Sequence, residues 1–136
     1  MKKFILFGGI YNVLLALFHC GFWKIWNWDT ELEKLSFTNK WVMQILNIQT
    51  IYYFIFTAVI CFVFQKELLT TKLGKCFLMG SAGFWFIRAV QQFAFWELGA
   101  VSTIIMTSFF LLGAVLFLVP AIRKQRAVTT NSSPRA

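Results

Sequence analysis

Side chains that hold metals or carry acid–base chemistry are scarce in this chain. Among its 136 residues it has one histidine, His19, three cysteines and five acidic residues. The cysteines Cys20, Cys61 and Cys76 form no CxxC pair and lie in or beside apolar runs, which argues against a disulfide framework and against a zinc site. A haem held between two histidines is excluded because His19 stands alone. We therefore expect neither a metal nor a cofactor.

Motifs that would specify a reaction are absent as well. The glycine pairs Gly8–Gly9 and Gly80–Gly83 lie inside apolar stretches and match no phosphate-binding spacing. No motif identifies a catalytic residue, so the sequence favours a protein that is not an enzyme.

Charge is also scarce, whereas apolar residues are abundant. Only 13% of the residues are charged and 59% are hydrophobic, with a mean hydropathy of +0.69. A soluble domain of this size could not bury so much apolar surface, so lipid must be the solvent. The formal net charge of +8 does not indicate nucleic acid, because the basic residues flank apolar segments and form no stripe on a polar face.

Four apolar stretches are long enough to cross a hydrocarbon core about 30 Å thick as helices. They cover residues 4–23, 41–64, 76–96 and 100–119. The alternation that a barrel requires is absent. We predict an all-α integral membrane four-helix bundle over residues 1–120, followed by a basic, disordered cytoplasmic tail over residues 121–136.

The positions of Lys and Arg predict the orientation of this bundle. Nine basic residues fall on one side of the predicted membrane and three on the other, while Arg88 lies inside a span. By the positive-inside rule, both termini and the second connection are then cytoplasmic. The larger group is Lys2, Lys3, Lys66, Lys72, Lys75, Arg123, Lys124, Arg126 and Arg135, and the smaller is Lys24, Lys34 and Lys40.

The first outer connection, residues 24–40, is predicted to contain a short helix. Thr30 followed by Glu33 fits a capping box, and Trp28, Leu32 and Leu35 share one side. Such a helix would lie flat on the outer surface, either as an interfacial anchor or as a lid over a pocket.

Polar residues inside the spans are the best guide to a site, since they are costly in lipid and turn toward protein or water. At about 1.5 Å and 100° per residue, three spans turn polar side chains toward one level, roughly 20 to 25 Å from the cytoplasmic edge. We predict an outward-facing polar cavity there. The candidate ligand-binding residues are Arg88, Gln91, Gln92, His19, Asn47 and Gln44, with Asn12 on the same helical face as His19.

Arg88 is the most costly of these residues, at about 2.5 kcal/mol or more for an arginine near the middle of a span. Neutral amides and His19 can share hydrogen bonds with its guanidinium without cancelling the charge. The remaining positive charge favours a carboxylate, a phosphate headgroup or a quinone oxygen. The alternative is that Arg88 extends toward the interface and that the amides only hold the helices together.

Three functions stay open. The leading hypothesis is a small polytopic membrane protein that binds, and in one version transports, a small amphipathic or anionic ligand such as a lipid, a quinone or a small anion. Transport would suggest a homodimer, because four spans form only a small translocation path on their own. The second is a non-enzymatic accessory subunit of a larger membrane complex, and the third is an enzyme using His19 as base and Arg88 as oxyanion partner. The architecture is similar to that of many small four-helix bacterial membrane proteins, which suggests the bacterial cytoplasmic (inner) membrane.

Overall fold

The computed structural model describes residues 1–95 and 101–122, and within these ranges the chain is helical and contains no strand. The predicted all-α class is therefore confirmed. The predicted tail lies almost wholly outside the described residues. The elements in chain order are α1 (Lys2–Cys20), α2 (Phe22–Ile25), α3 (Trp28–Glu31), the 3₁₀ turn η1 (Leu32–Lys34), α4 (Phe37–Val63), α5 (Gln65–Thr70), α6 (Lys72–Phe95) and α7 (Val101–Ile122).

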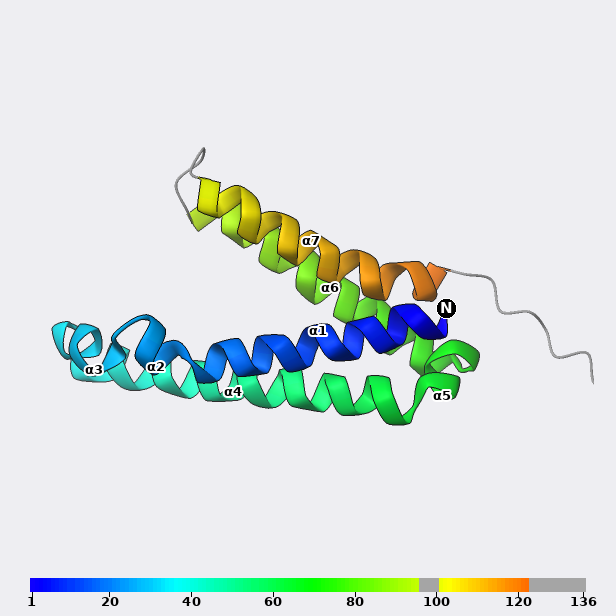
Figure 1. The fold of residues 1–136 in the computed structure, drawn as a ribbon, viewed down its shortest axis with the longest axis horizontal. Coiled ribbons are helices and arrows are strands. Elements are labelled where there is room, and N and C mark those ends of the chain that lie inside the picture. Colours follow the sequence, from blue (N-terminus) through cyan, green and yellow to red (C-terminus); the bar gives the residue numbers. More distant parts are fainter. Residues whose placement is uncertain (96–100, 123–136) are drawn as a thin grey trace, which may run out of the picture.

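The four long helices form two hairpins that diverge like the sides of a wedge (Figure 1). In one hairpin α1 packs along α4, and in the other α6 packs along α7. At the closed end of the wedge lie the start of α1, the short helix α5 and the C-terminal end of α7. At the open end lie α2 and α3 on one side and, on the other, the C-terminal end of α6 and the N-terminal end of α7.

Three of the four long helices are long and apolar enough to cross a membrane, namely α1, α4 and α7. Helix α6, with 24 residues, reaches about 36 Å and so has the length. Its composition falls short, because Lys72, Lys75, Arg88 and two glutamines dilute its apolar residues. The fourth crossing predicted from the sequence therefore stays a prediction.

The closed end is closely packed. Ile5, Cys61, Leu78 and Phe117, one from each long helix, are fully buried there. Gly8 lets the Phe117 ring approach α1, because a Cβ at this position would lie 3.1 Å from the ring. Small residues of this kind permit close contact between membrane helices. Farther along, the Tyr11 hydroxyl of α1 donates to the Phe109 carbonyl of α7 at 3.0 Å and ties the two hairpins together.

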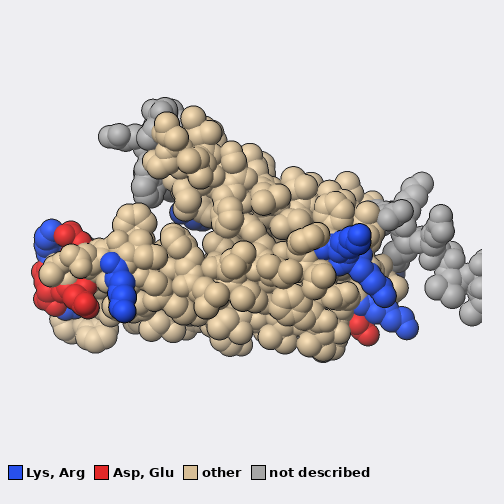
Figure 2. Space-filling model, in the orientation of Figure 1, with Lys and Arg blue, Asp and Glu red and all other residues tan. Residues whose placement is uncertain are grey.

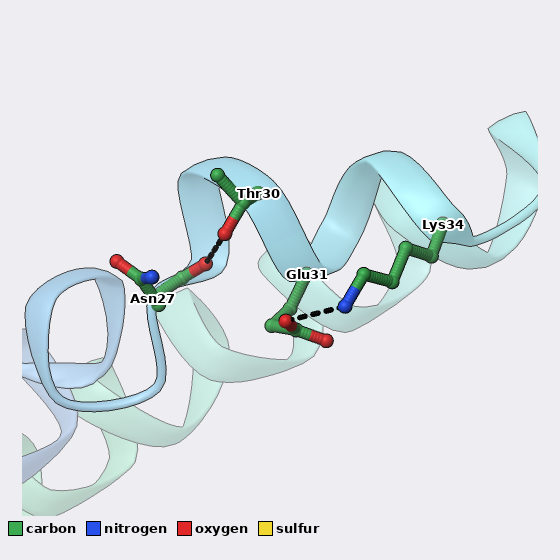
Figure 3. Close-up of polar contacts among 4 residues, drawn as sticks. All are labelled: Asn27, Thr30, Glu31 and Lys34. Carbon is green, nitrogen blue, oxygen red and sulfur yellow. Dashed lines mark hydrogen bonds and ion pairs between the residues drawn. The ribbon is translucent and has the colours of Figure 1, made fainter.

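The connection over residues 24–40 contains short helices, as predicted, but its capping is different. Figure 3 shows the Thr30 hydroxyl donating to the carbonyl oxygen of Asn27, 3.0 Å away, and Glu31 paired with Lys34. Asn27, at φ 50°, precedes α3 without a side-chain cap. The predicted Thr30–Glu33 capping box is therefore wrong, since the left-handed turn at Asn27 starts the helix earlier and leaves Thr30 inside it.

Other boundaries also shift. Helix α4 begins at Phe37, four residues before the predicted span, where the Ser36 hydroxyl accepts from the Asn39 backbone N–H at 3.5 Å. Helix α7 continues through Pro120 to Ile122 instead of ending at the proline. Pro120 is buried, lies two residues before the end of the helix and removes one backbone hydrogen bond, because proline has no N–H.

Candidate functional site

A pocket of about 230 Å³ lies between the two hairpins in the open half of the wedge. In Figure 2 the same end of the molecule shows a notch between the hairpins, with Lys or Arg atoms visible inside it. All four long helices and α2 contribute to its wall. Three lining residues are polar, His19, Thr50 and Arg88, and two are aliphatic, Leu15 and Met106. The remaining six are aromatic: Phe18, Phe22, Phe54, Phe84, Trp85 and Phe110.

Arg88 supplies the positive charge of the pocket. Its side chain is half-buried, and its guanidinium carbon lies 4.6 Å from the centroid of the Phe110 ring, a cation–π contact between α6 and α7. Among residues 1–95 and 101–122 it forms no ion pair. The ring supports the guanidinium without neutralising it, so the charge stays available to a ligand.

His19 is held by Asn47 through two hydrogen bonds between α1 and α4. Its Nδ1 lies 2.7 Å from Asn47 Oδ1, and Asn47 Nδ2 donates to the His19 carbonyl oxygen at 3.1 Å. The His19 ring also stacks on Phe22 at 4.3 Å between centroids and meets the edge of Phe54 at 5.2 Å. The imidazole is thereby fixed in place and orientation.

The same pair of bonds fixes which nitrogen of the neutral imidazole carries the proton. A carbonyl oxygen accepts only, so the amide nitrogen of Asn47 must face the His19 carbonyl and its oxygen must face Nδ1. Nδ1 is then the donor, and in the neutral ring Nε2 is an acceptor. The pocket wall thus includes one strong donor, Arg88, and the acceptor His19, beside the Thr50 hydroxyl, which donates to the Leu46 carbonyl at 2.7 Å.

The other four candidate residues lie off the pocket wall. The Asn12 amide donates to the Gly8 carbonyl at 2.8 Å, and the Gln44 amide donates to the Lys40 carbonyl at 3.3 Å, each within its own helix. The Gln91 side chain is exposed. Gln92 is 2% exposed, and its Oε1 has no hydrogen-bond partner among the described residues.

The structure therefore gathers Arg88 and His19 at one pocket, with Asn47 behind the histidine. The pocket is mainly aromatic, whereas the sequence predicts a polar one. The polar residues alone do not predict this aromatic wall, although two sequence patterns indicate it. Trp85 precedes Arg88 by three positions, and Met106 and Phe110 are four apart, so each pair shares a helix face.

A second cavity, of about 280 Å³, adjoins the pocket between α1 and α7. It shares Leu15, Phe18 and Met106 with the pocket. Its remaining lining residues are Leu14, Ile105 and Phe109. We name this second cavity the α1/α7 groove.

Comparison with known proteins yields no relative for this architecture. No protein-family model, curated protein or solved structure matches the chain.

Proposed function

We propose that this protein binds a small amphipathic molecule in the pocket between its hairpins, with an acceptor oxygen of the ligand on the Arg88 guanidinium. The observation that carries the proposal is an arginine without an ion-pair partner among the described residues, set in a wall of aromatic rings. The six rings offer an apolar ligand body a large contact area, and the guanidinium offers its polar end a fork of donors.

The energetics favour this assignment over a purely structural role for Arg88. An arginine in a span costs about 2.5 kcal/mol or more, and a cation–π contact returns about 0.5–2 kcal/mol. A charge-assisted hydrogen bond to an oxygen adds about 1.5–3 kcal/mol. The contact with Phe110 offsets only part of the cost of placing Arg88 in the membrane. A hydrogen bond from Arg88 to a bound acceptor oxygen offsets the rest.

In the proposed membrane arrangement, α6 crosses the bilayer beside α1, α4 and α7. Arg88 then points into the wedge, and the neighbouring helices shield the polar face of α6 from acyl chains. Figure 2 supports the orientation, because basic residues dominate the closed end while acidic and basic residues mix at the other. With the closed end cytoplasmic, the pocket opens toward the outer side. The proposed location is the bacterial inner membrane.

Native mass spectrometry of gently purified protein tests the proposal. We expect the unaltered protein to carry a small molecule that Arg88→Leu loses and that Lys75→Leu keeps, since Lys75 is an exposed cation of the same helix that does not line the pocket. Circular dichroism would verify that the variants fold. If Arg88→Leu does not fold, Arg88→Gln replaces it in the test. The same ligand mass on the Arg88 variant, or none on the unaltered protein, would contradict the proposal.

One observation favours the accessory-subunit alternative. Gln91 is exposed on α6 at about the depth of Arg88, and an amide facing lipid finds no hydrogen-bond partner unless another helix supplies one. If this role is the main one, Gln91→Leu should release a co-purifying membrane protein while leaving ligand retention unchanged. Under the binding proposal, Gln91→Leu changes neither.

A further inference from the structure

The α1/α7 groove continues the pocket toward the surface of the helices. Leu15, Phe18 and Met106 line both cavities, so the two share a wall. On the far side of the groove, Leu14 is 59% exposed and Ile105 61% exposed, which places its mouth on the face that acyl chains would cover. The apolar path therefore leads from the neighbourhood of Arg88 to the lipid-facing surface.

The groove is also lined almost entirely by carbon. Its residues are Leu14, Leu15, Phe18, Ile105, Met106 and Phe109. An extended hydrocarbon chain suits such a surface, and methionine adapts its shape to a flexible occupant. A charged or hydrated molecule finds no hydrogen-bonding side chain there. A ligand with a polar head near Arg88 and a hydrocarbon chain attached to it would occupy the pocket and the groove at the same time.

The polar residues of the pocket restrict the head of such a ligand. Arg88 only donates hydrogen bonds, and neutral His19 presents Nε2 as an acceptor because its Nδ1 is engaged by Asn47. A carboxylate can accept from Arg88 but has no proton for His19. A hydroxyl can accept from the guanidinium and donate to the imidazole.

The remaining pocket wall favours a flat ring to carry that hydroxyl. Phe18, Phe22, Phe54, Phe84 and Phe110 contribute aromatic surface around the polar pair. Aromatic rings prefer offset or edge contacts with one another, which a phenol can make and a glycerol or phosphate head cannot.

We infer that the ligand is a phenol bearing an alkyl or prenyl chain, with its ring and hydroxyl in the pocket beside Arg88 and His19 and its chain in the α1/α7 groove. This inference rests on the proposed function and adds the ligand class and its path. The molecule reaches the pocket sideways from the bilayer, between α1 and α7, and needs no aqueous opening.

Binding of three probes to the protein in lipid nanodiscs tests the head chemistry. The probes are para-nonylphenol, nonylbenzene, which lacks the hydroxyl, and para-cresol, which lacks the chain. We expect nonylbenzene to bind about tenfold more weakly than para-nonylphenol, the loss typical of one good hydrogen bond to a charged group. Equal affinity for these two probes would overturn the assignment of the head.

A matched pair of variants on α7 tests the path of the chain. Ile105 and Ile104 are neighbours with exposures of 61% and 59%, but only Ile105 lines the groove. Ile105→Trp should weaken para-nonylphenol about tenfold by filling the groove and leave para-cresol unchanged. Ile104→Trp should leave both affinities unchanged. Because both positions are exposed, neither variant should impair folding, and Ile105→Phe offers a milder block.

The same measurements separate failure of the inference from failure of the proposed function. If Arg88→Leu weakens both phenols while Ile105→Trp weakens neither, the pocket stands and the chain path is wrong. If Arg88→Leu loses a co-purifying molecule but para-nonylphenol does not bind the unaltered protein, the ligand class is wrong and the pocket stands. If Arg88→Leu changes neither phenol binding nor retention, both proposals fall.

Discussion

The two ends of the wedge differ in what fills the space between the hairpins. At the closed end, glycines let aliphatic and aromatic side chains interlock, with Phe117 against Gly8 and Leu78 fully buried. At the open end, aromatic rings line a pocket between the hairpins, and Arg88 and His19 lie on its wall. The closed end thus resembles an ordinary protein core. The open end instead contains a charged side chain, Arg88, and a pocket that is not filled by side chains.

This difference separates stability from binding in space. Substitutions at the closed end should change the free energy of unfolding, because the side chains there have no room to adjust. Substitutions at the open end should change ligand retention more than stability. The following changes test that division, beginning with the largest expected effect.

Gly74→Ala should destabilise the closed end most. A Cβ at Gly74 would lie 2.4 Å from the Glu67 carbonyl oxygen and 2.4 Å from the Leu68 Cα. Both contacts are with the backbone of α5, so α5 would have to move away from α6. We expect a loss of about 1–3 kcal/mol, as for other overpacked positions, measured by thermal unfolding followed by circular dichroism in detergent.

Gly80→Ala on the same helix is the control for that change. A Cβ at Gly80 meets no atom within 4 Å, so the gain in helix propensity of about 0.5–1 kcal/mol should remain. Opposite signs for the two alanines would support the packing explanation. A similar loss at both positions would mean that α6 itself, and not its contact with α5, limits stability.

Asn47→Ala should have the next largest effect, at the boundary between the two regions. It removes both hydrogen bonds to His19 and leaves partly buried polar groups of His19 without those partners, at a cost of about 1–3 kcal/mol. Gln44→Ala, in the same helix, loses one bond to its own backbone and should change stability by about 0.5 kcal/mol or less. Equal losses would show that the link between α1 and α4 contributes little.

Much of this arrangement is predictable from sequence. The apolar runs predict the three helices that have the length and composition of membrane spans. Simple helix geometry also brings His19, Asn47 and Arg88 to one depth, because rise per residue is a property of the backbone and varies little. In the structure His19 contacts Asn47, and Arg88 lies on the wall of the pocket that His19 lines. Both observations are compatible with a common depth.

Which partner a polar side chain selects is not predictable in the same way. Gln44 and Asn12 share helix faces with the site residues, yet each bonds to its own helix, since a backbone carbonyl one turn away is always within reach. The angle between the hairpins depends on details such as the Gly8–Phe117 contact. It is this angle that makes the pocket, so the aromatic wall could not be assembled from spacing alone.

The smallest expected effect lies at the tip formed by α3 and η1, beyond both regions of the wedge. Glu31 Oε1 and Lys34 Nζ are 2.6 Å apart, but their side chains are 53% and 67% exposed. Exposed ion pairs contribute about 0–1 kcal/mol, so Glu31→Gln should lower the free energy of unfolding by about 0.5 kcal/mol or less. Salt should erase that difference, because exposed charges are screened within about 10 Å at 0.1 M. Thermal unfolding of the two proteins at low and high salt would measure it.

A loss above about 1 kcal/mol that persists in high salt would mean that the tip is buried against lipid headgroups or a partner. The open end would then be covered from outside, and sideways access between α1 and α7 would become the only route to the pocket that the described residues leave.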